Sequence, residues 1–256
     1  MRYVGMNWKF LFLLWTLFTF SPSHAAEKVE IVAAEGSVTM GDSAGKVSKP
    51  VQTKDMISAG NVLSTGPDAK AVVKVGSSGF LVMGKNSQVE INSVENKPGF
   101  FRQIKGVIYY ALNSLKKNQH SMEVRTATTT IGIRGTRFIV SDEAERNEIG
   151  MRKGVVNVSS ADGEFEIHKK SQQDEFEAFK QEGSVAIDKV KSDFEKYSAK
   201  NQSEFIEYKR EFSLGANRMA SFDGKRVVER PLSGETEKDM ESFEEYADEW
   251  LKAVHD

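Results

Sequence analysis

Apolar and polar residues alternate with a period of two from Val29 to Ile167. Because successive side chains of a β-strand point to opposite faces, this alternation predicts many half-buried strands. Clusters of Gly, Asn, Asp and Pro interrupt the alternation at close spacing, as turns do. Each strand buries one face, so the strands must stack or wrap on one another. The pattern predicts a mainly β domain over residues 26–170 that folds without the rest of the chain.

A different spacing begins after Lys170, where apolar residues recur every three or four positions. This period is typical of an amphipathic helix, and Gly215 follows it as a helix cap does. We therefore expect a long amphipathic helix over residues 171–214. Its apolar stripe, the candidate interaction surface, consists of Phe176, Phe179, Ile187, Val190, Phe194, Tyr197, Phe205 and Phe212.

This stripe needs a cover, because each buried Phe side chain contributes about 1.5–3 kcal/mol. One cover is the chain itself, with the helix lying on the β domain or on the last helix. The other is a coiled coil with a second copy or with an envelope protein. Bulky Phe and Tyr fit the holes of a coiled coil poorly, so the pattern favours the first interpretation.

Two further segments follow the stripe. Residues 215–234 are polar, contain three glycines and Pro231, and are expected to form a linker. Residues 235–256 are rich in Glu and Asp and are expected to form an acidic amphipathic helix. Its predicted apolar face consists of Met240, Phe243, Ala247, Trp250 and Val254.

The first 25 residues have the order of a secretory signal peptide. Arg2 and Lys9 are basic, an apolar run follows from Phe10 to Phe20, and small residues precede Ala26. The apolar run is shorter than the ~20 residues of a membrane-spanning helix. We therefore expect cleavage between Ala25 and Ala26 rather than a retained anchor, and a periplasmic or secreted product.

The composition offers few groups for chemistry. The chain has no cysteine, which excludes disulfides, thiolate metal sites and cysteine nucleophiles. His120, His168 and His255, which follow the signal, are far apart in the sequence, and no catalytic signature occurs. The sequence predicts no enzyme and no catalytic, cofactor-binding or metal-binding residue. A formal net charge of -2 gives no field that would attract nucleic acid.

The most distinctive run extends from Val124 to Val140 and is filled with Thr, Ile, Val and Phe, which favour strands. Glycines within it predict two strands that meet at a kink. The candidate motif consists of Ile131, Gly132, Ile133, Arg134, Gly135 and Thr136. We favour a structural role for Arg134, whose donors would hold backbone carbonyls or an internal acidic group. The alternative is that Arg134 binds a carboxylate of a partner.

The run T-A-T-T-T-I-G-I-R-G-T-R-F, from Thr126 to Phe138, resembles the signature of the FecR-domain family of bacterial cell-envelope proteins. Weaker pieces agree in order, among them Glu35 to Val38 and Lys153 to Val158. The resemblance covers roughly Val29 to Ala161. It implies that the short strands wrap into a roll or solenoid-like sandwich, whereas the alternation alone also permits a Greek-key sandwich.

The resemblance implies a non-enzymatic binding or scaffold protein of the cell envelope, engaged in protein–protein interaction or envelope sensing. Signalling members of the family carry a cytoplasmic segment that contacts a sigma factor. Because nine residues precede Phe10, we expect no direct sigma-factor contact here. The alternative function is binding of peptidoglycan or another polysaccharide outside the cytoplasm.

Overall fold

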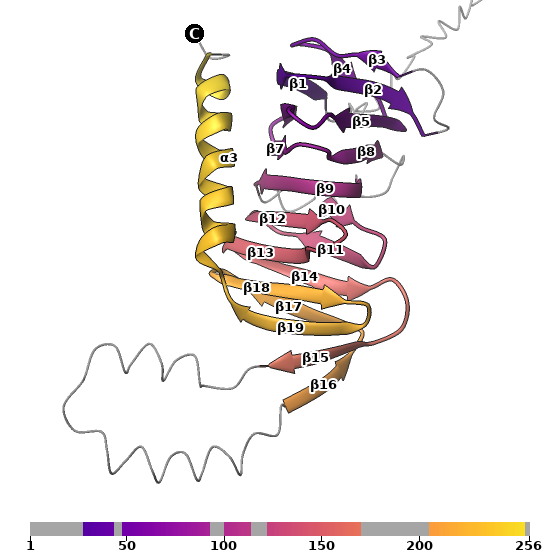
Figure 1. Cartoon of the computed structure of the whole chain (residues 1–256), viewed down its shortest axis with the longest axis vertical. Helices are drawn as coiled ribbons and strands as arrows, with labels where there is room; N and C mark the ends of the chain where they lie inside the picture. Colours follow the sequence, from indigo (N-terminus) through magenta and orange to yellow (C-terminus); the bar gives the residue numbers. More distant parts are fainter. Residues whose placement is uncertain (1–27, 44–47, 93–99, 114–121, 170–204, 254–256) are drawn as a thin grey trace, which may run out of the picture.

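The computed structural model describes residues 28–43, 48–92, 100–113, 122–169 and 205–253. Their short strands are stacked like rungs along the long axis of the molecule, and a helix runs beside them (Figure 1). This confirms the predicted mainly β fold with a helical C-terminal part. The stacking has the solenoid-like form that the family resemblance implied. None of the helices in the described ranges has the length and apolar character needed to span a membrane.

Sheet A is the larger of two sheets, and its strands are antiparallel except where β15 runs parallel to β19. In spatial order it contains β4 (Met56–Ile57), β1 (Val29–Glu35), β6 (Lys70–Val75), β7 (Gly79–Met83), the second half of β9 (Phe100–Leu112), β12 (Thr136–Asp142), β13 (Asn147–Lys153), β18 (Arg218–Asp223), β19 (Arg226–Pro231), β15 (Phe165–Lys169) and β16 (Phe205–Lys209).

Sheet B lies opposite sheet A and is also antiparallel, apart from the parallel pair of β9 and β10. In spatial order it contains β3 (Lys49–Pro50), β2 (Val38–Asp42), β5 (Asn61–Thr65), β8 (Gln88–Asn92), the first half of β9, β10 (Met122–Arg125), β11 (Thr129–Ile133), β14 (Val155–Ser160) and β17 (Glu211–Gly215).

β9 joins the two sheets, because it pairs with β8 before Gly106 and with β7 after it. Gly106 has a φ of 90°, and a Cβ there would lie 2.4 Å from the Cα of Ser87. Buried Gln103 secures the bend: its side-chain amide donates to the carbonyls of Gly106, at 2.8 Å, and Val140, at 3.0 Å. Tyr110 donates to the Gln103 side-chain carbonyl at 3.0 Å. The polar groups at the bend are thus satisfied inside the core.

The main core lies between the two sheets. Side chains at alternate positions of both sheets fill it, among them five that are 0% exposed: Ile31, Leu81, Phe138, Ile131 and Val156. Near its centre the Tyr110 ring stacks on Phe138 with 5.1 Å between the ring centroids. Burial raises the pKa of the Tyr110 hydroxyl, so this group stays a neutral hydrogen-bond donor.

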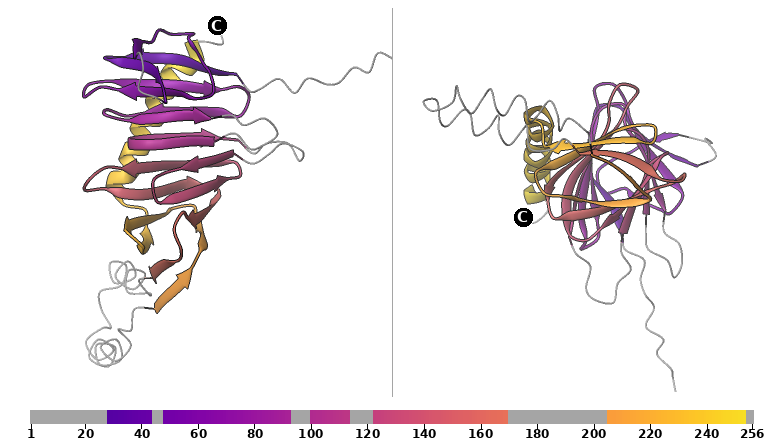
Figure 2. Two further views of the ribbon diagram at one scale, coloured as in Figure 1. Left: turned by 90° about the vertical axis from the view of Figure 1, so that its right-hand side faces the viewer. Right: turned by 90° about the horizontal axis from the view of Figure 1, so that it is seen from below.

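Helix α3 (Gly234–Ala253) covers the outer face of sheet A (Figure 2). Met240, Phe243 and Ala247 of its apolar face are buried against outward side chains of sheet A, including Tyr109 and Ile139. These helix residues are the ones that the sequence pattern predicted. From β1 to β13, sheet A is therefore buried on both faces, by sheet B on one side and by α3 on the other.

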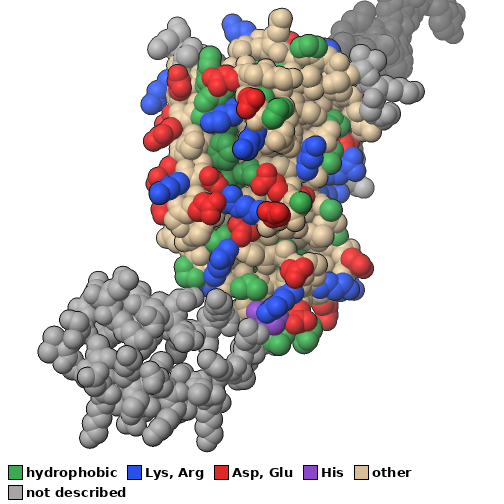
Figure 3. All heavy atoms as spheres, viewed as in Figure 1, with side chains coloured by type: hydrophobic (Ala, Val, Ile, Leu, Met, Phe, Trp, Pro, Cys, Tyr) green, Lys and Arg blue, Asp and Glu red, His purple; other side chains and the backbone are tan. Residues whose placement is uncertain are grey.

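The acidic side of α3 is anchored by arginines of sheet A. Glu244 accepts a hydrogen bond from the buried Tyr109 hydroxyl and lies 3.3 Å from Arg152 and 3.5 Å from Arg137. Arg146 forms an ion pair with Asp239 at 2.9 Å. Burial lowers the pKa of the Arg146 guanidinium, but its hydrogen bonds to Asp239 and Glu148 have the larger effect, so the pKa is raised. Basic and acidic side chains accordingly gather beside the helix (Figure 3).

The structure corrects the predicted elements after residue 204. Residues 205–209 and 211–215 are strands β16 and β17, not the end of a long helix. Residues 218–231, within the predicted linker, form the β18–β19 hairpin. The short apolar runs in these segments fit both the helical period and the strand period. They form strands because they can pair with strands that the earlier part of the chain supplies. Residues 170–204, with the first part of the predicted helix, lie outside the described residues.

These strands also correct the expectation that the β domain closes by Ile167. β18 pairs with β13, and β17 pairs with β14, so both sheets take strands from beyond residue 204. Leu214, Met219 and Val227 are buried in the structure, each at 0% exposure. Gly224 and Lys225 form the two-residue turn of this hairpin, with a φ of 57° at the glycine. A glycine at this position of a two-residue turn is typical of a β-hairpin.

Candidate functional site

The outer face of sheet B is exposed, whereas α3 covers the corresponding face of sheet A. We call this outer surface the open face. Strand register places one row of its side chains across neighbouring strands, so residues distant in sequence meet on one surface. The row consists of Glu90, Arg102, Arg125, Thr130, Ser159 and Glu211.

An arginine and an aromatic ring occupy the middle of the open face. The Arg125 guanidinium lies 4.1 Å from the ring centroid of Phe100, within the range of a cation–π contact. Glu123 holds the same guanidinium through a 2.8 Å ion pair. Beside it, Arg102 forms an ion pair with Glu90, whose side chain is buried. These contacts hold both guanidinium groups in place at the surface.

Exposed apolar side chains also lie on the open face. Ile104 of β9 is 40% exposed and Val155 of β14 is 54% exposed. Phe100, Arg102 and Ile104 share a face because they occupy alternate positions of β9. The sequence pattern did not identify these residues as part of a site. The alternation of side chains along each strand is visible in the sequence, but it does not show which sheet has its outer face covered by a helix.

The candidate motif forms the corner at which the chain passes from sheet B to sheet A. Ile131 and Ile133 of β11 point into the core, and Thr136 at the start of β12 is buried. Gly132 lies between the two isoleucines on the open face. Gly135 has a φ of 71°, which lets the chain turn between the sheets. The predicted kink at the glycines is thus located at Gly135.

Arg134 does not have the structural role that the sequence analysis favoured. Its side chain is exposed at the corner, and among the described residues it forms no hydrogen bond or ion pair. It is therefore available to solvent at the margin of the open face, near the level of exposed Val155. This position fits the alternative, in which Arg134 meets a carboxylate of a partner.

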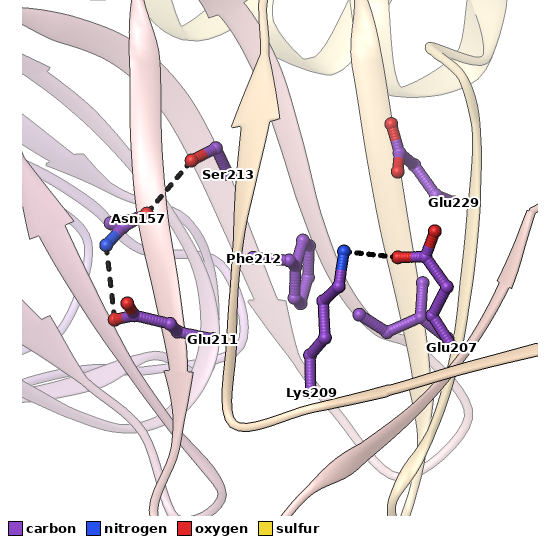
Figure 4. A pocket seen from close by; sticks show the side chains of 8 residues that line it. Asn157, Glu207, Lys209, Glu211, Phe212, Ser213 and Glu229 are labelled. Carbon is purple, nitrogen blue, oxygen red and sulfur yellow. Dashed lines mark hydrogen bonds and ion pairs between the residues drawn. The ribbon is translucent and has the colours of Figure 1, made fainter.

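A cleft of about 290 Å³ lies where the open face ends at β17 (Figure 4). Asn157 and Glu211 lie on one side of the β17 ribbon, while Glu207 and Lys209 lie on the other. Phe212 lies between them and packs edge-on against buried Phe165, at 5.6 Å between centroids. The complete lining is Asn157, Ile167, Glu207, Lys209, Glu211, Phe212, Ser213 and Glu229.

The polar groups of the cleft are linked to one another. Lys209 pairs with Glu207 at 2.5 Å, and Glu229 pairs with Arg218 at 3.1 Å. On the open face, Ser213 donates to the Asn157 side-chain carbonyl at 3.0 Å, and the Asn157 amide reaches Glu211 at 3.4 Å. No group of three or more metal-ligating side chains occurs among the residues described. The cleft offers hydroxyl, amide and carboxylate groups around one ring.

The predicted interaction stripe is only partly within the structure. Phe205 and Phe212 belong to strands β16 and β17. The rest of the stripe lies outside the described residues, and its helical form stays a prediction: Phe176, Phe179, Ile187, Val190, Phe194 and Tyr197.

Part of the chain matches one family model. Residues 61–157 match the model of the FecR protein family, which spans β5 to β14 and contains the corner and most of the open face. Two crystal structures of a "putative anti-sigma factor" from Parabacteroides distasonis ATCC 8503, at 2.50 and 1.65 Å resolution, are 10% identical to this chain with a TM-score of 0.44. The match covers 69% of this chain and 62% of theirs, which is less than two thirds of their length. No curated protein matches the sequence.

Proposed function

Because residues 61–157 match the FecR family model, we propose that the protein is a non-catalytic protein-binding module of the bacterial cell envelope. The family match and the arrangement of the open face support this function together. Arg102 and Arg125 on this face, and the charged groups of its cleft, are engaged in ion pairs, which orient them before a partner binds.

The open face is the observation that carries the proposal. Arg and aromatic side chains are enriched at protein interfaces, and Arg125 with Phe100 supplies both at its middle. Exposed Ile104 adds apolar area beside them. Since ion pairs already orient the arginines, binding loses less side-chain entropy than it would with free side chains.

Photocrosslinking in intact cells tests this function. A photoreactive residue replaces Ile104 on the open face or, as the control, exposed Glu245 on α3. We expect a discrete crosslinked protein from position 104 and none from position 245. Adding Arg125→Glu should remove the crosslinked product while the protein level is unchanged. Equal crosslinking from both positions would contradict the open face as the binding surface. Crosslinking from position 104 that is unchanged by Arg125→Glu would contradict it as well.

Polysaccharide binding is the second candidate, and the cleft favours it. Asn157, Ser213 and Glu211 form a hydrogen-bonded row at the cleft, and their amide, hydroxyl and carboxylate groups are suited to binding sugar hydroxyls. Sedimentation with purified peptidoglycan distinguishes the two functions. Co-sedimentation that is lost in Asn157→Ala but kept in Arg125→Glu supports the polysaccharide; the reverse pattern supports a protein on the open face.

We also propose that the protein acts outside the cytoplasm after removal of residues 1–25. The support is the order of basic, apolar and small residues that ends at Ala25. The intact mass of the exported protein should correspond to a chain that begins at Ala26. A product in the membrane fraction that retains Met1 would overturn this proposal.

A further inference from the structure

β16 is the last strand of sheet A, at the end of the molecule remote from β4 (Figure 1). Among the described strands it pairs with β15 alone, so its second edge has no strand beside it there. An exposed edge strand presents backbone donors and acceptors in a fixed pattern, which is a template for another strand.

The register shows which backbone groups lie on this edge. Glu166 of β15 donates its N–H to Lys225 on the β19 side, so the neighbouring residues of β15 face β16 instead. Ile167 pairs with Glu207, whose backbone groups therefore point toward β15. Ile206 and Tyr208 alternate with Glu207, and their N–H and C=O groups consequently point away from β15.

The same two residues expose large apolar side chains. Ile206 is 41% exposed and Tyr208 is 65% exposed, the highest fraction among the large apolar side chains described. Their side chains lie on the face of β16 opposite Glu207 and Lys209, which line the cleft. Hydrophobic side chains are visible at this end of the molecule (Figure 3). Backbone edge and apolar side chains thus coincide on one short strand.

We propose that β16 pairs antiparallel with β16 of a second copy of this chain, about a two-fold axis at Glu207. In this register each Ile206 lies opposite Tyr208 of the second copy, and the N–H and C=O groups of both residues exchange hydrogen bonds. An aromatic ring opposite a β-branched side chain is a favourable cross-strand pair. The pairing satisfies the outward backbone groups of Ile206 and Tyr208 in both copies at once.

The charges on the other face of β16 fit a second copy. Glu207 meets Glu207 of the second copy, but each carboxylate is already paired with its own Lys209 at 2.5 Å. Each Lys209 also lies diagonal to Glu207 of the second copy, so the four charges balance. Because the contact is isologous, it closes as a dimer and leaves no β16 edge for further growth. The inference does not depend on the function proposed for the open face.

Light scattering of the purified protein over a range of concentrations tests the dimer. Proline at position 208 removes an N–H that points away from β15, so Tyr208→Pro blocks the second copy and leaves the β15 pairing intact. We expect a concentration-dependent dimer for the wild type and a dissociation constant at least about tenfold higher for Tyr208→Pro, with little change in melting temperature. Tyr208→Thr, which keeps the N–H, should weaken the dimer less. Val155→Lys is the control, because it changes an exposed apolar residue on a strand paired on both sides.

A wild type that stays monomeric up to about 1 mM would overturn the proposal, as would a Tyr208→Pro dimer of unchanged affinity. The register is tested by a disulfide, since the chain has no cysteine of its own. Facing residues that do not exchange hydrogen bonds have Cα atoms about 4.5 Å apart, within the range of a disulfide. Glu207→Cys should therefore give a covalent dimer on mild oxidation faster than Tyr208→Cys. Faster crosslinking through position 208 would overturn the axis at Glu207.

Discussion

At the scale of single residues, the crossings between the two sheets depend on glycine. Gly106 bends β9, and Gly135 turns the chain from β11 into β12, each with a positive φ. An L side chain in this conformation costs roughly 1–2 kcal/mol. At each crossing the fold depends on the backbone conformation of the glycine, whereas the side chain of Arg134, beside Gly135, is exposed to solvent.

Substitutions at Gly135 and at its neighbour Arg134 test whether the glycine, rather than the arginine, stabilises the crossing. Gly135→Ala should reduce the stability by about 1–2 kcal/mol, because alanine is strained at a φ of 71°. Arg134→Ala should change it by less than about 0.5 kcal/mol, since the exposed guanidinium has no partner among the described residues. Thermal melts of both variants check this. A large loss in Arg134→Ala with none in Gly135→Ala would restore the structural role for the arginine.

Asp142 gives the molecule a predictable response to pH. Burial raises the pKa of its carboxyl group above the ordinary value, so the folded state binds a proton more tightly than the unfolded state. Its charged form therefore destabilises the fold at neutral pH, and this cost disappears as the pH falls below the ordinary pKa of about 3.9.

The neutral variant Asp142→Asn should consequently melt at a higher temperature than the wild type at pH 7, and the difference should shrink as the pH falls toward 4. Melting curves at several pH values measure it. Asp162→Asn, at an exposed position, serves as the control. A difference that grows on acidification would contradict the burial of the Asp142 carboxyl group.

At the scale of elements, the sequence predicted those whose period was long and unambiguous. The strands up to Ile167 alternate over many residues, and the spacing of Met240, Phe243 and Ala247 identified the buried face of α3. β16 and β17 were missed because Phe205 and Phe212 also continue a helical spacing over a short stretch. The local period does not distinguish a helix from a strand in such a short stretch. These segments become strands because they pair with the edges of β15 and β14.

The candidate site was predictable to a smaller degree. The corner motif was found because its glycines and β-branched residues are local signals. The open face was not, since it forms only when β8, β9, β10, β11, β14 and β17 lie side by side and when α3 covers sheet A rather than sheet B. Such a surface depends on long-range pairing, which a single sequence does not display.

The docking of α3 is testable through one buried side chain. Met240 is 0% exposed between the helix and sheet A, so Met240→Ala should cost about 2–5 kcal/mol through lost contacts and a cavity. Glu245→Ala, at an exposed position of the same helix, controls for changes in helix propensity. Denaturant melts should show the loss in the first variant alone. Equal stabilities would mean that α3 contributes little to the fold.

At the scale of the whole molecule, the C-terminal part belongs to the β fold. β18 and β19 connect β13 to β15, while α3 returns along sheet A toward β1 (Figure 1). A chain cut after residue 170 would lose these strands, expose one edge each of β13 and β14, and uncover Tyr109 and Ile139 beneath the helix. The early part of the fold is thus completed by the last residues of the chain.

Lys169 and Phe205 are facing residues of the β15–β16 pair, so residues 170–204 connect two strand ends that already lie side by side. We predict that an Asn-Gly turn in place of residues 170–204 keeps the fold, since this dipeptide closes an antiparallel hairpin. The melting temperature of this variant should stay near that of the wild type, whereas a chain that ends at residue 170 should show no cooperative melt. The two variants share the loss of the predicted stripe from Phe176 to Tyr197 and differ in β16 to β19 and α3. Cooperative unfolding of the shorter chain would return the domain boundary to residue 170, and failure of the hairpin variant would mean that residues 170–204 cover part of the core.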